Sequence, residues 1–336
     1  MNDIRWGIMA TGAIAHALAR AILDTPGGTL AAVASRNRER AAAFAGQYGA
    51  DRAYGSYREL AKDDDLDVIY IATPHSEHAA NMRMCLENGR HVLCEKAFTL
   101  NAAEARACID LARERDRFLM EAMWMRFFPA MAEVRRRLAA KEIGEVRLVQ
   151  ADFCIDLPYD SAHRLYNPDL GGGALLDLGI YPLSLATMVL GLPDAVNGHA
   201  HLSPTGVDEL DTITLTYARG ASAQLTCSMR LNRPREAFLV GSDGYIQIHD
   251  LFFRPTQLTV YRHGRDPEDI HLPFKSNGYR HEVEEVQRCL REGRRESAIM
   301  PLDETLALMA IMDRLRRAWG VAYPGEAPAT PDAVGG

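Results

Sequence analysis

Three residues with acid–base side chains stand out in two short segments of the sequence. Lys96 lies in Cys94-Glu95-Lys96-Ala97, and Asp177 and Tyr181 lie in the glycine-rich segment 171–182. The phenol of Tyr181 could accept or donate a proton at neutral pH if its pKa, ordinarily about 10, were lowered. A neighbouring lysine cation is a sufficient cause, and it could also stabilise a developing alkoxide.

Both segments also have a purely structural interpretation. Asp177 and Tyr181 are four residues apart, so on a helix they share one face and bring a carboxylate and a phenol into an apolar setting. The glycines and Pro182 are costly in a helix unless the geometry requires them there. Equally, Tyr181 could be a core aromatic residue, Asp177 a charge near a helix start, and Lys96 a surface residue that closes a strand.

Alternating strand and helix patterns over the first third of the chain would position Lys96. Residues 66–73 form an almost continuous apolar run, which is typical of a strand buried on both faces. The alternation predicts an α/β fold with a doubly wound parallel sheet of Rossmann type, which binds ligands at the carboxyl ends of its strands. Strands are predicted at 4–9, 30–34, 53–54, 66–73, 91–94 and 118–121, and helices at 14–23, 38–48, 56–61, 77–87 and 101–115.

The turn after the first strand falls where such a fold carries the dinucleotide fingerprint G-x-G-x-x-G. Alanines replace two of the three glycines, at Ala10 and Ala15. Gly12 would let the backbone approach a pyrophosphate, whose charge is favoured by a helix N-terminus. The alternative is an ordinary strand–turn–helix. The candidate cofactor-binding residues in this turn are Ala10, Thr11, Gly12, Ala13 and Ile14.

The end of the second strand bears on which dinucleotide would bind. An Asp or Glu here bonds the ribose 2′-hydroxyl in NAD-selective folds, but the chain has Ser35-Arg36-Asn37, with no carboxylate before Glu39. A hydroxyl beside a guanidinium suits a 2′-phosphate. Ser35 and Arg36 therefore favour NADP, with NAD as the alternative if Arg36 is only a solvated residue.

Two further strand ends supply cofactor candidates. Thr73, Pro74, His75 and His78 follow the fourth strand, and contact with a cofactor is as plausible for the two histidines as a structural role. Glu95 and Lys96 follow the fifth strand and would face the same edge of the sheet.

The pattern changes after residue 122. Helices are predicted at 130–140, 174–190, 280–292 and 302–319, and a strand at 146–155. From 195 to 263 strands follow one another without helices, with hairpin turns at 218–220 and 243–244. We expect a Rossmann domain (1–122), an α+β domain on a large, open, mainly antiparallel sheet (123–325) and a tail (326–336).

Composition limits the possible partners. The chain has 336 residues, of which 47% are hydrophobic, as in an ordinary soluble protein. Its net charge of -7 argues against nucleic acid or an anionic membrane as the main partner. Six cysteines are scattered singly, which favours reduced thiols over a disulfide frame or a metal site. A strand begins too early for a signal peptide, and we count no apolar run of membrane-spanning length, so a cytoplasmic protein is expected.

Together these segments resemble the glucose–fructose oxidoreductase and inositol dehydrogenase family (Gfo/Idh/MocA). GIMATGAIA, CEKA and GGGALLDLGIY occur in the family's order, and the likeness runs from Trp6 to about Trp319. EAMWMRFFP (121–129) and RLYNPDLGGGALLD (164–177) are most similar to the branch of dimeric dihydrodiol dehydrogenases and NADP-dependent aldose dehydrogenases. Ala97 departs from the proline usual after the lysine, which is expected to loosen the turn.

The resemblance implies roles for residues at matching positions. Lys96 would be the catalytic lysine, Asp177 would orient substrate hydroxyls, and Tyr181 would be the proton donor or acceptor. His75 would lie near the cofactor, and the branch implies a homodimer formed through the open sheet. The residues expected to bind substrate are Trp124, Arg126, Phe127 and Arg164.

The resulting hypothesis is an NADP-dependent oxidoreductase that acts on a secondary or anomeric alcohol of a sugar, inositol or cyclic trans-diol without a metal. Two alternatives remain: a ketoreductase of nucleotide-linked deoxysugar biosynthesis, and a non-catalytic NADP sensor with a partner-binding sheet. Loops 156–167 and 230–235 would decide the choice of substrate.

Overall fold

The computed structural model describes residues 3–326 and divides the chain into two compact units. The first comprises the chain up to Phe127 together with Phe274–Leu306, and the second comprises Phe128–Pro273 and the residues from Ala307 onward. The segment 274–306 thus belongs to the first unit, although the sequence analysis grouped it with the second domain. Apart from Glu326, the expected tail lies outside the described residues.

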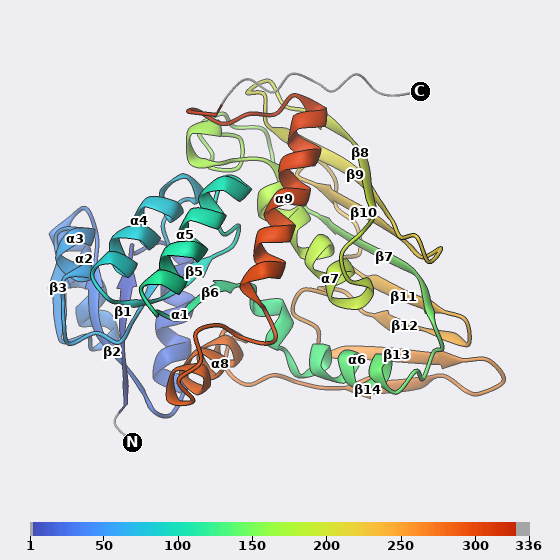
Figure 1. Ribbon diagram of the computed structural model, residues 1–336, viewed down its shortest axis with the longest axis horizontal. Coiled ribbons are helices and arrows are strands. Elements are labelled where there is room, and N and C mark those ends of the chain that lie inside the picture. The colour runs from blue at the N-terminus through green and yellow to red at the C-terminus, as the bar shows by residue number, and fades with distance from the viewer. Residues whose placement is uncertain (1–2, 327–336) are drawn as a thin grey trace. The chain divides into compact units, whose positions relative to one another are not determined.

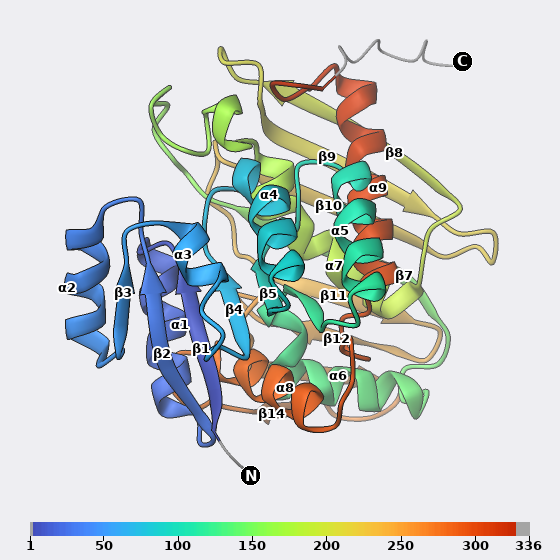
Figure 2. The same ribbon diagram turned by 60° about the vertical axis from the view of Figure 1, so that its left-hand side comes forward.

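A six-stranded parallel sheet forms the core of the first unit (Figure 2). Its strand order, β3-β2-β1-β4-β5-β6, is that of a dinucleotide-binding Rossmann fold, as predicted. The strands are β1 (Ile4–Met9), β2 (Gly28–Ala34), β3 (Arg52–Tyr54), β4 (Val68–Ile71), β5 (His91–Glu95) and β6 (Leu119–Ala122). The helices are α1 (Ala13–Asp24), α2 (Arg38–Tyr48), α3 (Tyr57–Ala61), α4 (His75–Glu87), α5 (Ala102–Glu114), η1 (Trp124–Phe127) and α8 (Arg280–Arg291).

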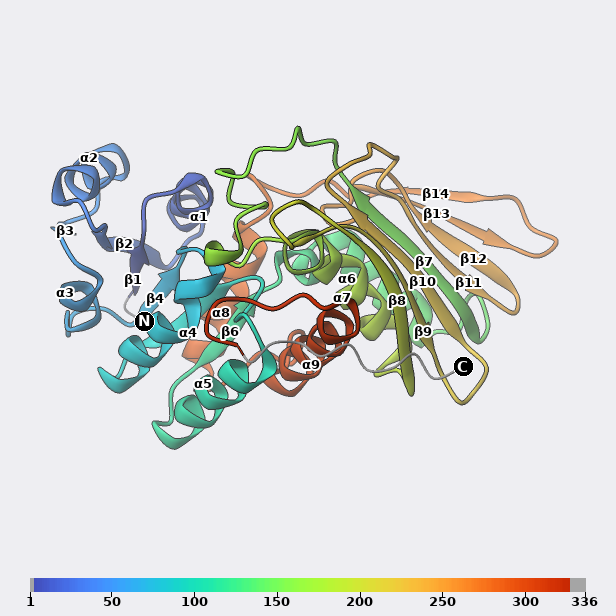
Figure 3. The same cartoon turned by 90° about the horizontal axis from the view of Figure 1, so that it is seen from above.

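Local sequence explains why these helices begin where they do. The side chains of Asn37, Ser56 and Asn101 each accept a hydrogen bond from a backbone N–H in the first turn of the helix that follows. Helices α1 and α2 lie on one face of the sheet and α4 and α5 on the other (Figure 3). The central strand β4 is therefore buried along its whole length, as its continuous apolar run predicts.

An eight-stranded sheet organises the second unit, in the order β14-β13-β12-β11-β7-β10-β9-β8. All neighbouring strands are antiparallel except β7 and β10, which are parallel. The strands are β7 (Val146–Cys154), β8 (Ala195–Leu202), β9 (Asp208–Thr216), β10 (Ser222–Ser228), β11 (Ala237–Gly241), β12 (Gly244–Ile248), β13 (Gln257–Arg262) and β14 (Glu268–His271). The sequence analysis did not predict β14, whose four residues include three polar ones.

Helices cover only one face of this sheet. They are α6 (Pro129–Ala139), the 3-10 turn η2 (Pro168–Leu170), the π-helix η3 (Leu175–Gly179), α7 (Ile180–Leu190) and α9 (Leu302–Trp319), of which the residues up to Leu306 belong to the first unit. Figures 1 and 3 show α6 and α7 on the same side, with no helix of this unit on the other side among the described residues. The open, mainly antiparallel sheet is therefore confirmed.

The stretch Pro168–Leu190 corrects one expectation. It is long and apolar enough to span a membrane, with a mean hydropathy of 1.6, whereas the sequence analysis counted no such run. Within the described structure, 89% of this apolar window is buried inside the protein. A helix that is apolar on every side is also what the core of a large domain requires.

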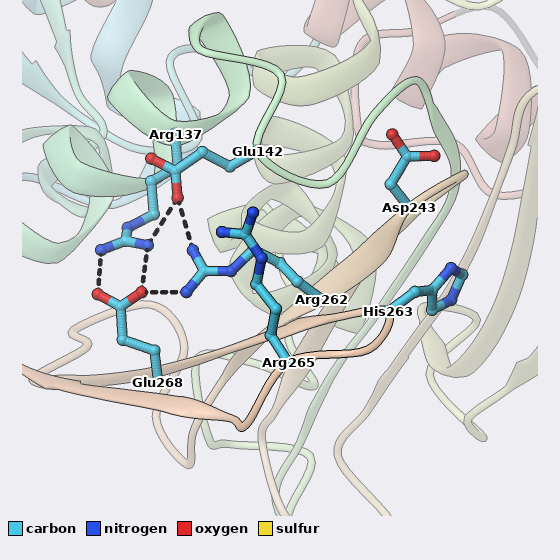
Figure 4. Close-up of a pocket in the computed structure, with 7 residues that line it drawn as sticks. All are labelled: Arg137, Glu142, Asp243, Arg262, His263, Arg265 and Glu268. Carbon is cyan, nitrogen blue, oxygen red and sulfur yellow. Dashed lines mark hydrogen bonds and ion pairs between the residues drawn. The ribbon is translucent and has the colours of Figure 1, made fainter.

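A charged cavity of about 740 Å³ lies on the second unit, between the end of α6 and the strands β13 and β14 (Figure 4). Arg137 and Arg262 both bond Glu142 and Glu268, at nitrogen–oxygen distances of 2.6–3.1 Å. The two arginines lower the pKa of Glu268 to about 2. This network fixes α6 to the strand pair at the edge of the sheet, and no candidate site residue lines the cavity.

Candidate functional site

The turn between β1 and α1 has the geometry of a phosphate cradle. Ala10 has a φ of 85°, a conformation that favours glycine, so the alanine occupies the backbone position of the fingerprint's first glycine. Gly12 is the N-cap of α1, makes no side-chain cap, and no acidic residue lies in the first turn. A Cβ atom placed on Gly12 would meet nothing within 4 Å. The helix N-terminus is thus open to an anion.

The end of β2 offers a hydroxyl and a guanidinium. Ser35 is 8% exposed, and its Oγ accepts a hydrogen bond of 3.3 Å from the backbone N–H of Asn37. The side chain of Arg36 is 77% exposed and reaches Glu77 only at 3.5 Å. Because this ion pair is long and solvated, it holds the guanidinium weakly, and Arg36 could turn to a phosphate group.

The loop that carries Lys96 is held by the segment after β4. His78 is fully buried, and its ring nitrogens lie 2.9 Å from the carbonyl oxygen of Ala97 and 2.8 Å from that of Thr73. Burial, aided by the neighbouring His75, lowers the pKa of His78 to about 4, so the ring is neutral and donates to one of the two carbonyls. His78 therefore has a structural role in holding this loop, which is one of the two roles that the sequence left open.

Lys96 itself is partly exposed at the end of β5. His75 Nε2 lies 3.2 Å from the Lys96 carbonyl oxygen, and the Lys96 N–H donates to Glu95 Oε2 at 3.2 Å. The hydroxyl of buried Tyr70 donates to the other Glu95 oxygen. The peptide bond between Lys96 and Ala97 is cis. The Glu95 carboxylate thus accepts hydrogen bonds from the backbone of its own loop and from a side chain of β4.

The predicted substrate residues of η1 are all buried. Trp124 stacks on Tyr279 with ring centroids 4.1 Å apart and planes 5° apart. Arg126 is 2% exposed, and its guanidinium binds Glu304 at 2.5 Å, which ties η1 to the first turn of α9 within the first unit. Phe127 is 9% exposed. Arg126 is therefore held in a buried ion pair, and its expected contact with substrate stays a prediction.

Asp177 lies in a π-helix, where the sequence predicted an ordinary helical turn. The side chain of Asp177 is 8% exposed, and its two oxygens accept from the guanidinium of Arg164 at 3.1 and 3.3 Å. Arg164 comes from the loop after β7 and is 57% exposed. Single π-turns are frequent at functional sites. A carboxylate paired with a guanidinium combines hydrogen-bond acceptors and donors, which suits the recognition of hydroxyl groups.

Tyr181 lies one turn after Asp177, at the start of α7, among aromatic rings. Its ring centroid is 5.3 Å from that of Phe153 on β7 and 5.5 Å from that of Phe253, and these two phenylalanines stack at 4.2 Å. Sequence reasoning missed both of them. The pair Phe252-Phe253 in a polar loop was an available signal.

A second cavity of about 750 Å³ in the same unit includes parts of the two loops expected to select substrate. Asp156, Tyr159, Tyr166 and Arg230 are among its lining residues. Within residues 3–326, no group of three or more His, Cys, Asp or Glu side chains could hold a metal ion. The six cysteines are buried and unpaired.

Two family models match the chain. The one described as "Oxidoreductase family, NAD-binding Rossmann fold" matches residues 4–123, and the "GFO/IDH/MocA C-terminal domain" matches residues 131–247. These matches cover the turn at Gly12 and Lys96 in the first case, and Asp177 and Tyr181 in the second.

Curated relatives align over nearly the full length. The chain is 39% identical over 331 residues to the trans-1,2-dihydrobenzene-1,2-diol dehydrogenase of Danio rerio, covering 95% of this chain and 98% of the relative. The enzyme of the same name from Mus musculus is 37% identical over 333 residues, covering 96% and 98%.

Solved structures share the whole fold. A 3-ketoreductase from Actinomadura kijaniata in complex with NADP and TDP-benzene is 28% identical, with a TM-score of 0.83 over 94% of this chain and 97% of that one. An aldose–aldose oxidoreductase from Caulobacter crescentus complexed with glycerol has a TM-score of 0.86 over 94% and 97%. Its identity is 24%, so it supports the fold alone.

Gly12→Ala tests the phosphate cradle. The added methyl group meets no protein atom and the residue has a φ of -77°, so the melting temperature should stay close to that of the wild type. If a pyrophosphate contacts this backbone, the same methyl group should weaken dinucleotide binding by about 10-fold or more, because close approach there requires glycine. Calorimetric titration with NADP measures the affinity. Wild-type affinity in Gly12→Ala would contradict this placement, and Gly46→Ala, also without neighbours within 4 Å, is the control.

Proposed function

Because the chain belongs to the Gfo/Idh/MocA oxidoreductase family, we propose that it transfers a hydride between NADP and a secondary or anomeric alcohol of a cyclic diol, sugar or inositol. It is an NAD(P)-dependent oxidoreductase acting on CH–OH groups, which leaves no ground for a purely non-catalytic sensor. Six buried, unpaired cysteines support a reducing, cytoplasmic setting as part of this proposal.

The first unit has groups that fit the cofactor. The uncapped N-terminus of α1 suits the pyrophosphate, and the strongly exposed Arg36 beside Ser35 suits a 2′-phosphate. Since no carboxylate stands at the end of β2, the site lacks the group that would select the ribose 2′-hydroxyl of NAD. When bound, the nicotinamide would accept or donate the hydride.

The proposed proton chemistry belongs to Lys96 and Tyr181. During oxidation, Tyr181 Oη accepts the proton of the substrate hydroxyl, and during reduction it returns that proton. The Lys96 cation lowers the pKa of the phenol and stabilises the charge on oxygen. Asp177, held by Arg164, orients hydroxyl groups next to the reacting carbon.

One observation carries the substrate proposal. A carboxylate paired with an arginine and a phenol flanked by two phenylalanine rings lie one turn apart on a single buried helical segment. The carboxylate–arginine pair suits adjacent hydroxyl groups of a substrate. The aromatic side chains suit the apolar face of the substrate's ring. Cyclic trans-diols and sugars have both features, and the curated relatives named above act on such a diol.

A nucleotide-linked keto sugar is the second candidate substrate. The structural neighbour from Actinomadura kijaniata is a 3-ketoreductase bound to TDP-benzene, at 28% identity. The curated diol dehydrogenases are closer in sequence, at 36–39% identity. We therefore rank the cyclic diol or simple sugar first.

The open sheet face supports a proposed homodimer. Leu148, Val240, Tyr245 and Tyr261 are directly paired neighbours on β7, β11, β12 and β13, and all are partly exposed. The residues that alternate with them, such as Leu239, Ile246 and Val260, are fully buried on the helix-covered face. The four side chains thus form an apolar row on the uncovered face, which a second copy of the chain would bury.

A substrate and cofactor panel tests the function directly. Absorbance at about 340 nm should rise with NADP and at least one trans-diol or aldose, since reduced nicotinamide absorbs there.

Arg36→Gln should raise the KM for NADP about 10-fold or more and leave the KM for NAD nearly unchanged, because a charge-assisted bond to the 2′-phosphate is lost. Arg58→Gln, on α3, is the control. No turnover of any diol or sugar alongside reduction of a TDP-linked keto sugar would instead favour the second candidate.

Lys96→Met and Tyr181→Phe test the catalytic assignment. Each should lower kcat by roughly 100-fold or more, the usual contribution of a general acid–base group, while NADP still binds. If the two residues act on the same oxygen, the double variant should be little worse than the worse single one. Lys141→Met and Tyr217→Phe are matched controls outside the proposed site. A variant at Lys96 or Tyr181 with near wild-type kcat would refute the assignment.

Substitutions in the apolar row test the proposed dimer. Sedimentation should show a dimer for the wild type and a monomer for the double variant Tyr245→Glu, Tyr261→Glu, because two charges would be buried at the interface. Lys141→Glu, an exposed change after α6, should remain dimeric. A wild-type monomer, or a dimer that survives both tyrosine changes, would exclude this face.

A further inference from the structure

A buried pair of acidic residues lies beneath the helix that carries Asp177 and Tyr181. Asp208 and Asp211, at the start of β9, are both 0% exposed. Neither has a part in the proposed proton chemistry. Two carboxyl groups out of contact with water are costly unless they are paired or protonated, so their place in the fold needs a physical reason.

Asp208 bonds the beginning of the π-helix. The backbone N–H of Leu175 donates to Asp208 Oδ2 at 2.5 Å. Leu175 is the first residue of η3 and precedes Asp177 by two residues. No side chain caps η3 at its N-cap residue, Ala174, so Asp208 supplies from another element the acceptor that a capping residue would supply locally.

The second oxygen of each carboxyl group points to a shared proton. Oδ1 of Asp208 and Oδ1 of Asp211 have no conventional hydrogen-bond donor in the described chain. The two carboxyl groups interact with each other through their side chains, and two carboxyl groups can share a hydrogen bond only if one of them is protonated. Burial, with the charge of Asp208, raises the pKa of Asp211 well above its usual range, and burial also raises the pKa of Asp208, so the pair retains a proton at neutral pH.

Glycines of the 171–182 segment leave room for this pair. A Cβ atom on Gly173, where φ is +121°, would lie 2.5 Å from Asp208 Oδ1. A Cβ atom on Gly179, the last residue of η3, would lie 2.8 Å from Cys227 Sγ, and that thiol donates to Asp211 Oδ2 at 3.0 Å. The cluster of Asp208, Asp211 and Cys227 thus contacts the π-helix near both of its ends.

We propose that Asp208 and Asp211, sharing one proton, are positioning residues that fix the π-helix and thereby set the placement of Asp177 and Tyr181. The inference rests on the proposed function, because it assigns the pair a role through those two residues. Without Asp208, the Leu175 N–H would lose its acceptor and Asp211 its partner, while the residues that bind the cofactor, in the other unit, would be unchanged.

Three variants test the pair. Asp208→Ala should lower kcat by about 10- to 100-fold, the range expected when reacting groups are displaced by a fraction of an ångström to one ångström, with an unchanged Kd for NADP. Asp208→Asn keeps an acceptor for Leu175 and a donor toward Asp211, so it should restore kcat to within about 3-fold of the wild type. Asp211→Asn imitates the protonated acid and should also stay within about 3-fold. An unchanged kcat in Asp208→Ala, or no recovery in Asp208→Asn, would overturn the proposal.

The control separates positioning from a general loss of stability. Val260→Ala removes buried methyl groups from β13, which four strands separate from β9. It should lower the melting temperature but not kcat. If Tyr181→Phe is inactive while Asp208→Ala is fully active, the positioning role fails and the proposed function stands. If Tyr181→Phe is active, the proposed function itself fails.

Infrared spectroscopy tests the shared proton without any enzymatic activity, and it remains decisive if Asp208→Ala does not fold. The difference spectrum between the wild type and Asp211→Asn at neutral pH should contain the C=O stretch of a protonated carboxylic acid. A difference spectrum with only carboxylate bands would show both acids ionised and would overturn the proposal.

Discussion

All six strands of the first sheet run in the same direction, so their carboxyl ends meet along one edge. That constraint places Ala10, Ser35, Thr73 and Glu95, which are far apart in the sequence, at the ends of neighbouring strands. Two features of this edge bear on the proposed cofactor site. Gly12 leaves the N-terminus of α1 uncovered, and the buried His78 ties the loop of Lys96 to the end of β4.

The alanine at position 10 shows how far a fingerprint can depart from its consensus. The turn requires a positive φ there, which costs an alanine roughly 1 kcal/mol more than a glycine. An alanine at that φ shows that the geometry is retained although the residue that usually supplies it is absent. Sequence reasoning that counts glycines underestimates such a turn, because the backbone conformation is set by the strand before it and the helix after it.

Much of the fold follows from periodicity, and much of the site does not. The alternation of apolar strands and helices predicts the Rossmann sheet, and the hairpin turns predict the second sheet. Periodicity does not say which unit a helix joins, so the sequence analysis did not group Phe274–Leu306 with the first unit. It also did not predict β14, because that strand has no apolar alternation. Periodicity also cannot identify partners: Arg126 is paired with Glu304 and Tyr181 with Phe153 and Phe253, across long sequence separations.

The second unit illustrates why acidic residues in a core strand are informative. A sheet interior normally excludes carboxyl groups, yet Asp208 and Asp211 at the start of β9 are both fully buried. Apolar side chains in their place would have no desolvation cost. The cost of burying Asp208 is offset by the hydrogen bond that its carboxyl group accepts from the Leu175 N–H at the N-terminus of η3. No residue within that segment provides an acceptor for this N–H. A capping side chain within the segment 171–174 would have to fit among glycines that are packed against Leu165 and Asp208. The acceptor therefore comes from the sheet, and the geometry of Asp177 and Tyr181 depends on the pairing of β9 with its neighbours.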